Sequence, residues 1–419
     1  MRVLLTTRVH KTALAVLLLS FASAYAGWVL LAYRAARFAA RSDRGGLQRA
    51  IALEPGNAEY YDLLGTHLFY AAQDLTSSIT QYKTAASLNP YVARYWLDLA
   101  RAYLTAGDVA QVRASLAHAV AAEPRTLDVL WEAANDYLVL GATDEALPYV
   151  RTVLQNDPSR TSTALNLCWR MIGDVNLMMA QALPRHSGVY LAFVKMLVDR
   201  DEGAAAAQVW SSLLSLRQKV PAENAFPYVQ YLIQRHEVAS ATAAWRALPG
   251  IAPNMQQYMP SDSNLIVNGQ FAEDFLNAGF DWRYQAIPHV KVTLDEGRHD
   301  GQRSVAVAFD GDSVNQPGIY QLVALEPDTR YEFSAWVRTD NLLGVAGPRL
   351  AIQDAYGTDT FFRTDSLSGT TPWNELKAEF TTPHDASLGA LRIAVPGTTH
   401  VGGTLWITDL RLTKLPAKS

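Results

Sequence analysis

The chain has 419 residues, 49% of them hydrophobic and 18% charged, with a formal charge of −4 from 36 basic and 40 acidic side chains. This composition is too apolar for a disordered chain, and the length corresponds to about two or three domains. Because there is no basic excess, no nucleic-acid partner is expected. The single cysteine, Cys168, excludes an intrachain disulfide and a cysteine-rich zinc site, and its apolar neighbours indicate a buried helical thiol.

The N-terminal segment, residues 1–33, has a basic start at Arg2, Arg8 and Lys11, followed by an uncharged run from Thr12 to Tyr33. As a helix that rises about 1.5 Å per residue, this run spans the hydrocarbon core of a membrane. The alternative is a signal peptide cleaved near residues 22–26. Because the apolar run continues past those sites, a transmembrane anchor over 12–33 is favoured.

The orientation of this anchor is not decided by charge alone. Five arginines follow the span: Arg34, Arg37, Arg41, Arg44 and Arg49. Applied literally, the positive-inside rule keeps the large domain in the cytoplasm. The short basic N-terminus and the C-terminal domain described below favour export instead. We expect a single-pass protein of the cell inner membrane with its large domain on the periplasmic, outer face, and the cytoplasmic placement is the alternative.

A ladder of prolines follows the anchor. Pro55, Pro90, Pro124 and Pro158 are spaced by 35, 34 and 34 residues, and the first three end apolar stretches that contain alanines. Aromatic, small and turn residues recur at matching places in the units between them: Tyr61, Leu64, Gly65, Tyr82, Ala85, Trp96, Ala100, Tyr103, Gly107, Leu116, Ala119, Ala134, Tyr137, Gly141 and Ala146. This period resembles the tetratricopeptide repeat, which implies two antiparallel helices per unit.

The small residues of this pattern, such as Gly65, are expected to let the paired helices approach closely, and Gly107 to take a left-handed conformation at a helix end. One unit cannot bury its apolar face alone, so the units must stack. The weaker echo between Trp210 and Trp245 extends the prediction to an α-solenoid of tetratricopeptide-like helical hairpins over residues 34–248. A proline-rich linker is predicted at 249–263.

The resemblance also implies a concave groove, lined by the first helix of each unit, that holds a protein partner as an extended peptide. The residues carried over by position are Asp62, Thr66, Arg94, Asp98, Arg101, Asp128, Glu132 and Asn135. The alternative is that these polar side chains form an ordinary solvated face.

From residue 264 onward the apolar pattern changes to a period of two. In the stretch 329–338, Tyr331, Phe333 and Val337 share one face and polar residues fill the other. Similar alternation recurs between turn signals, which predicts a C-terminal antiparallel β-sandwich over residues 264–415. The whole chain is therefore predicted to be a multidomain protein with an α-solenoid and a β-sandwich.

The order of motifs in this region is more specific. Asn264-Leu-Ile-Val-Asn-Gly-Gln-Phe271 opens it, the run 331–338 lies in the middle, and Gly403-Thr-Leu-Trp-Ile-Thr-Asp-Leu-Arg-Leu412 closes it. This resembles the jelly-roll carbohydrate-binding modules of the galactose-binding-like superfamily. Such modules often hold a structural calcium through acidic residues, where this chain has Ala272 and Thr408. No metal or other cofactor is therefore expected, although backbone carbonyls and Asp409 leave a calcium site open.

A sugar site of such a module needs aromatic rings and planar polar groups on the face away from the core. The candidates, with Tyr356 and Trp373 expected in loops, are Glu332, Trp336, Arg338, Gln353, Tyr356, Trp373, Arg392 and Trp406. The alternative for Trp336 and Trp406 is that they cap the sandwich or pack against the solenoid.

No catalytic residue is predicted, because the sequence lacks a phosphate-binding loop, a zinc-protease motif and a nucleophile elbow. We expect a membrane-anchored, non-catalytic scaffold whose solenoid binds a protein and whose jelly roll contacts a polysaccharide, in cell-envelope or exopolysaccharide assembly or export. The alternatives are a purely protein-binding assembly factor with a degenerate jelly roll and, third, a glycan-active enzyme.

Overall fold

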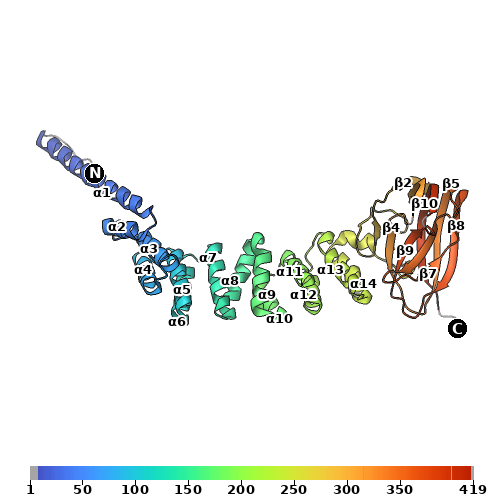
Figure 1. Cartoon of the computed structure of the whole chain (residues 1–419), viewed down its shortest axis with the longest axis horizontal. Helices are drawn as coiled ribbons and strands as arrows, with labels where there is room; N and C mark the ends of the chain where they lie inside the picture. The colour runs from blue at the N-terminus through green and yellow to red at the C-terminus, as the bar shows by residue number, and fades with distance from the viewer. Residues whose placement is uncertain (1–7, 315, 398, 417–419) are drawn as a thin grey trace. The chain divides into compact units, whose positions relative to one another are not determined.

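The computed structural model describes residues 8–314, 316–397 and 399–416, without the side chains of 295–298. Arg2, part of the predicted basic start, lies outside the described residues. The chain divides into two compact units, Met1–Val189 and Tyr190–Ser419. Figure 1 labels their helices and strands.

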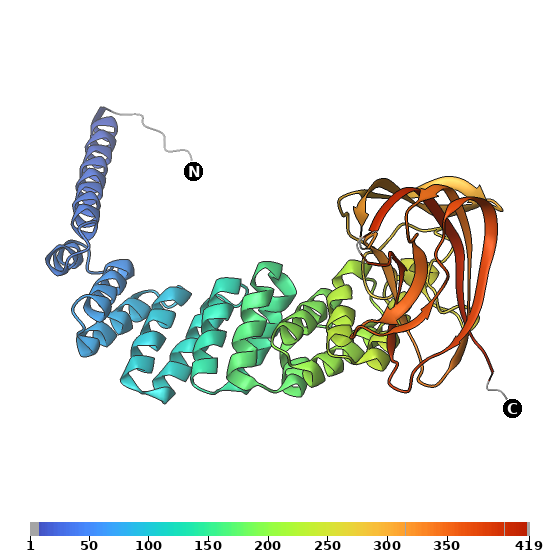
Figure 2. The ribbon, with the colours of Figure 1, turned by 45° about the vertical axis from the view of Figure 1, so that its right-hand side comes forward.

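The first unit consists of paired helices, which lie side by side in Figure 2. Its elements are α1 Arg8–Ala39, α2 Arg44–Leu53, α3 Ala58–Tyr70, α4 Leu75–Leu88, α5 Ala93–Ala106, α6 Val109–Ala122, α7 Leu127–Val139, α8 Thr143–Asn156, η1 Pro158–Arg160, α9 Thr161–Ile172, α10 Val175–Leu177 and the π-helical turn η2 Met178–Ala182. Pro55, Pro90 and Pro124 lie in the turns between pairs, and Pro158 opens η1. The predicted helical hairpins are confirmed.

Local chemistry explains where these helices begin and end. Asp43, Asp74 and Asp108 precede the second helices of successive pairs, and each side chain accepts a hydrogen bond from a backbone N–H of the first turn. Gly107, at φ +76°, ends α5 in the predicted left-handed conformation. A Cβ on Gly65 would lie 2.8 Å from the Tyr82 ring, so the small residue permits the close packing of α3 and α4.

Helix α1 joins the apolar N-terminal run to the first hairpin without a break. Its apolar stretch is exposed, and by length and composition it can cross a membrane or serve as a signal sequence. Near its C-terminus, Ala35 and Ala39 are buried in a small core with Leu47 and Ala50 of α2. The exposed N-terminal part of α1 is therefore apolar, and only its C-terminal part pairs with α2 as a helical hairpin.

The second unit begins with helical pairs and continues into the sandwich. Its helical elements are α11 Ser187–Asp199, which starts just before the boundary, α12 Gly203–Leu216, η3 Ala222–Asn224, α13 Phe226–Gln234, α14 Val238–Ala247, η4 Leu248–Gly250 and η5 Pro253–Tyr258. The segment 249–263, predicted as a linker, thus contains helical turns. Met255 and Tyr258 of η5 are buried.

This segment and α14 are fastened to the sandwich. Trp245 of α14 is fully buried, donates from Nε1 to the Tyr258 carbonyl at 2.9 Å, and meets Phe280 edge-on. The Tyr258 hydroxyl donates to the Asp274 carbonyl at 3.0 Å. The last helices therefore share one compact unit with the strands, and the domain boundaries drawn from sequence stay a prediction.

Two five-stranded antiparallel sheets make the sandwich. Sheet 1 has the order β1-β4-β9-β6-β7 and sheet 2 the order β2-β3-β10-β5-β8. The strands are β1 Trp282–Tyr284, β2 Val290–His299, β3 Gln302–Val314, β4 Ile319–Ala324, β5 Arg330–Leu343, β6 Arg349–Asp354, β7 Thr360–Arg363, β8 Gly369–Thr381, β9 Leu388–Ala394 and β10 Thr399–Lys414.

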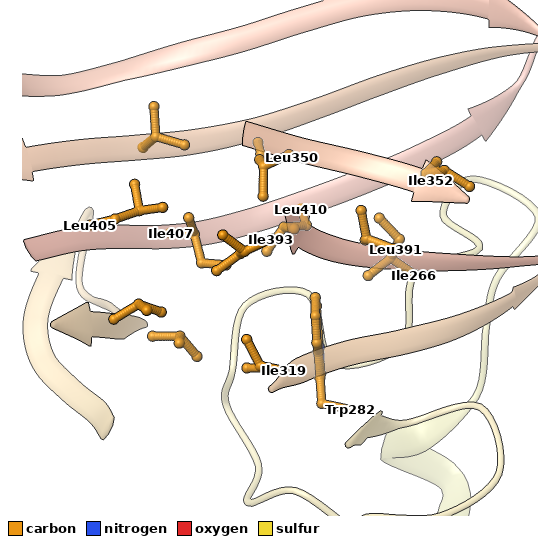
Figure 3. Packing of buried hydrophobic residues seen from close by; sticks show 14 of the residues in the cluster. Ile266, Trp282, Ile319, Leu350, Ile352, Leu391, Ile393, Leu405, Ile407 and Leu410 are labelled. Carbon is orange, nitrogen blue, oxygen red and sulfur yellow. The ribbon is translucent and has the colours of Figure 1, made fainter. Parts of the chain in front are cut away.

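The core lies between the sheets. Leu350 and Ile393 of sheet 1 and Leu405 and Ile407 of sheet 2 are among its buried side chains (Figure 3). Tyr331, Phe333, Ala335 and Val337 of β5 all point into this core, as the alternation predicted. Both sheets therefore turn the residues between their core positions outward, and these outer faces carry the candidate site.

Candidate functional site

The eight predicted sugar-binding residues divide between the two outer faces. Five lie on sheet 2: Glu332, Trp336 and Arg338 in β5, Trp373 in β8 and Trp406 in β10. Gln353 and Arg392 lie on sheet 1, and Tyr356 lies in the loop after β6. Trp373 is thus in a strand rather than in the predicted loop. The residues form two separate groups, because β5, β8 and β10 belong to sheet 2 whereas β6 and β9 belong to sheet 1.

On sheet 2 the aromatic rings are stacked on neighbours of the same sheet. His299 at the end of β2 stacks on Trp336 with ring centroids 4.1 Å apart, and it tilts against Trp373 at 5.3 Å. The Arg338 guanidinium carbon lies 4.8 Å from the centroid of the Trp406 ring. One face of Trp336 and one face of Trp406 are therefore already in contact, which leaves less ring surface for a sugar.

The charges of sheet 2 are also paired. Lys377 lies 2.9 Å from a carboxylate oxygen of Glu332, and Arg330 lies 2.6 Å from one of Glu379. These pairs join the neighbouring strands β5 and β8 on the outer face. They neutralise four of the charged side chains of this face without a ligand.

On sheet 1 a pocket of about 340 Å³ lies between the strands and α13. Its walls combine apolar side chains of β4 and β9, two tyrosines, and amide and guanidinium groups. Among its lining residues are Leu322, Leu388, Ala390, Tyr320, Tyr356, Gln230, Gln234, Arg283 and Arg392. Apolar walls with a few convergent polar groups are the usual composition of a ligand site.

Hydrogen bonds hold this pocket in shape. The Tyr356 hydroxyl donates to the Ile233 carbonyl of α13 at 2.7 Å, and its ring stacks on His236 with centroids 3.7 Å apart. Arg283 Nη2 donates to Gln230 Oε1 at 2.7 Å and to the Gly279 carbonyl at 3.0 Å. Helix α13 and the edge strand β1 are thereby tied together.

Arg392 occupies the middle of sheet 1. Its Nη1 donates to Gln316 Oε1 at 3.2 Å, and its guanidinium carbon lies 5.8 Å from the Tyr320 ring centroid. Burial lowers the pKa of this guanidinium from its usual value, since few charges compensate the lost hydration. The Arg392 guanidinium is therefore a partly desolvated cation.

A larger pocket, about 500 Å³, lies beside α14 and the end of β4. Glu326 and Lys414 at this pocket form a salt bridge with each other. Thr242, Pro260 and Leu265 also line it. Because the smaller pocket lies on the outer face that holds Arg392 and Tyr356, it is the better candidate for a ligand.

In the first unit, the predicted groove residues of α5 and α7 join in a network of ion pairs. Arg94 and Arg101 lie 3.2 Å and 2.9 Å from the buried carboxylate of Asp98, and Arg101 also reaches Glu132 at 3.2 Å. Asp128 pairs with Arg160. The predicted residues of these helices therefore contact one another across neighbouring repeats.

Three other groove residues, Asp62, Thr66 and Asn135, are buried or half-buried. Thr66 accepts a hydrogen bond from the Tyr82 hydroxyl at 3.2 Å. Asp62 is 5% exposed, and Asp62 Oδ1 and Asn135 Oδ1 have no hydrogen-bond partner among the described residues. Burial, and then the charge of Asp98, raises the pKa of Asp62 to about 7. The Asp62 carboxyl is thus a buried acceptor whose hydrogen-bonding capacity is not filled within the described residues.

The positions compared with calcium-binding residues are used for other contacts. Thr408 Oγ1 donates to the Arg303 carbonyl at 2.6 Å, and Asp409 pairs with Arg411 at 3.0 Å. Across the described part of the chain, no group of three or more His, Cys, Asp or Glu side chains is arranged to hold a metal ion. The expectation of no cofactor remains a prediction.

Sequence reasoning missed several members of the sheet 1 pocket. The alternation in β4 could have placed Tyr320 outward, beside Arg392 in the register. Arg283 and Gln230 come from distant segments, and only the tertiary fold brings them together. No local pattern could have indicated that contact.

Comparisons with known proteins agree with this architecture. Residues 263–399 match the model of a family described as a carbohydrate binding domain. No curated protein matches the chain.

Among solved structures, one described as "CBM4 structure and function" is similar at 20% identity over 36% of this chain and 99% of that chain, with a TM-score of 0.29. A tetratricopeptide repeat protein from Parabacteroides merdae is similar at 15% identity over 54% and 93% of the two chains, with a TM-score of 0.31. YrrB, described as a TPR protein with an unusual peptide-binding site, is similar at 14% identity over 50% and 93%, with a TM-score of 0.26.

The chain therefore combines a tetratricopeptide-like helical region with a C-terminal jelly roll of the carbohydrate-binding kind. Both resemblances predicted from sequence are confirmed. Both kinds of domain are non-catalytic.

Proposed function

We propose that the protein is a membrane-anchored, non-catalytic scaffold whose sandwich binds a glycan and whose helical repeats hold a protein partner. The observation that carries the proposal is the pocket on sheet 1, whose strands lie in the region matched by the carbohydrate-binding family. Its apolar floor suits the C–H face of a sugar ring, and its arginine and amide groups suit hydroxyls or charged substituents.

Helix α1 is the proposed anchor. Its exposed apolar stretch would cross the inner membrane once, with the large domain on the periplasmic side. A glycan-binding protein held there would serve in cell-envelope or exopolysaccharide assembly or export. The protein partner would lie along α3, α5 and α7, where the exposed side chains of Arg94, Arg101 and Glu132 offer donors and acceptors to a peptide.

The test is binding of the full chain, in detergent micelles, to a panel of soluble polysaccharides. Tyr320→Ala, which removes a ring from the pocket wall, should weaken binding about tenfold while the protein still folds. Trp336→Ala, on sheet 2, should leave binding unchanged. Loss of binding only in Trp336→Ala would move the site to sheet 2.

Two outcomes would support the other candidates. Absence of binding to every polysaccharide would favour a purely protein-binding assembly factor. Release of reducing ends during the incubation would indicate a glycan-active enzyme.

A further inference from the structure

A single line of outward-facing side chains crosses sheet 1 and contains three arginines. The strand register pairs Arg283 of β1 with Tyr320 of β4, and Tyr320 with Arg392 of β9. It continues from Arg392 to Ala351 of β6 and on to Arg363 of β7. Since neighbouring strands lie about 4.8 Å apart, successive arginines of this arginine row are roughly 10 Å apart.

A fourth arginine widens the row. Arg349 of β6 pairs with Ala394 of β9, two residues further along each strand and on the same outer face. Its Nη2 donates to Ser366 Oγ at 3.1 Å. The outer face of sheet 1 therefore gathers four guanidinium groups from four of its five strands.

Carboxylates do not neutralise this group within the described residues. The hydrogen-bond acceptors of Arg283, Arg349 and Arg392 are amide oxygens, a backbone carbonyl and a hydroxyl. The Nε atoms of the same three arginines are buried and have no hydrogen-bond partner there. Other arginines of the sandwich, such as Arg330 and Arg411, pair with carboxylates.

A half-buried cation without an opposite charge is costly, because the hydration it has lost is not replaced. Arg283, Arg349 and Arg392 are only half-buried and Arg363 is exposed, so a carboxylate from outside can reach guanidinium groups that no carboxylate of the described residues neutralises. A guanidinium presents its N–H groups in a planar fork that fits a carboxylate. The row also continues into the pocket through Arg283, Tyr320 and Arg392, so an anionic group and a sugar ring would be met together.

We propose that the arginine row recognises the carboxylates of an acidic polysaccharide built from uronic-acid-type sugars. The inference rests on the glycan binding proposed above and names the class of glycan. Regular spacing of the cations favours an extended polymer with repeated charges over a single small anion. The neutral floor of the pocket, Leu322, Leu388 and Ala390, would contact the ring that carries the charge.

The experiment compares two polymers with the same backbone, polygalacturonate and its methyl ester, by calorimetric titration of the full chain in detergent. The free acid should bind about tenfold or more tightly than the ester, which keeps the sugar but loses the charge. Arg392→Gln should weaken binding of the acid by about tenfold. Arg363→Gln, at an exposed position, provides a second test if Arg392→Gln fails to fold.

Arg330→Gln is the matched control, because it removes the same charge from sheet 2, where Arg330 is paired with Glu379. It should bind polygalacturonate as the unaltered chain does. Equal weakening by Arg330→Gln and Arg392→Gln would reveal unspecific attraction and overturn the proposal. Equal affinity for acid and ester would also overturn it, yet leave the glycan-binding function intact, whereas no binding to any polysaccharide would end both.

Discussion

The two outer faces of the sandwich have the same backbone architecture but differ in how their polar side chains are paired. Each covers a five-stranded sheet over the same core. On sheet 2, Glu332 and Lys377 neutralise each other and Trp336 stacks on His299. On sheet 1, Arg392 and its neighbours remain without carboxylate partners among the described residues, beside a pocket closed by α13. A face whose charged side chains pair with one another offers few groups to a ligand, whereas a face with unpaired arginines is the better candidate for a binding site.

The largest expected effect is the loss of stability caused by a substitution in α14, which packs beside sheet 1. Trp245→Ala removes a fully buried ring that packs against Phe226 and Phe280. The free energy of unfolding should fall by about 3–5 kcal/mol, as for other buried aromatics. Urea unfolding of the full chain measures it, with Trp336→Ala as the comparison on sheet 2. A loss below about 1 kcal/mol would mean that α14 is not part of the sandwich's cooperative unit.

A buried carboxyl next to sheet 1 should make stability depend on pH. Asp281, directly before β1, is 0% exposed, accepts from the Leu276 N–H at 2.7 Å and has no partner for Oδ1 among the described atoms. Burial raises its pKa from 3.8 to about 7. The folded chain therefore holds a proton that the unfolded chain has lost between these values, so stability falls as pH rises from about 4 to 7.

Asp281→Asn should remove this slope and raise stability near pH 7 by roughly 4 kcal/mol, about 1.4 kcal/mol for each of about three pKa units, because the amide keeps an acceptor and carries no charge. Thermal melts of both proteins between pH 4 and 8 measure the difference. Parallel pH profiles would contradict a raised pKa at Asp281. The glycan affinity of the variant at pH 7 should be unchanged, since Asp281 faces the interior.

Local contacts and strand alternation could be predicted from the sequence, whereas the assignment of strands to sheets could not. The repeat was predictable because its contacts are local: Gly65 meets Tyr82 seventeen residues later, within one period. The inward direction of Tyr331 and Phe333 followed from alternation alone. Alternation indicates which side of a strand faces out, but not to which sheet the strand belongs.

That limit explains the division of the predicted sugar-binding residues. Trp406 and Arg392 both face outward on neighbouring strands of the chain, yet they lie on opposite sheets. The contact between Arg283 and Gln230 joins residues 53 positions apart across a strand and a helix. Such a contact depends on tertiary packing and leaves no periodic trace.

A smaller effect is expected from Trp336→Ala on sheet 2. The ring is half-buried and stacks on His299. The free energy of unfolding should fall by about 1–2 kcal/mol, from the lost ring pair and partial burial. Glycan binding should stay as it is, measured on the same protein sample. A large loss of affinity with normal melting would transfer the sugar site to this face.

The smallest effect should come from a paired charge. Glu332→Gln breaks the salt bridge to the exposed Lys377 on sheet 2. Exposed ion pairs add little to stability, so no measurable shift of the melting temperature is expected. Its counterpart on sheet 1, Arg392→Gln, should likewise melt normally but lose affinity for the acidic polymer. A clear destabilisation by Glu332→Gln would show that the charges of sheet 2 matter more than this comparison allows.

The uninterrupted course of α1 has a mechanical consequence. Ala35 and Ala39 are locked against α2, and no proline or glycine stands between Trp28 and Ala39. Kinks in helices arise mainly at such residues, so this part of α1 should behave as a stiff rod. If the proposed span lies in a bilayer, its tilt and rotation would turn the first hairpin with it. The orientation of the first repeats would then be set by the membrane, because a stiff helix and not a flexible linker connects them to it.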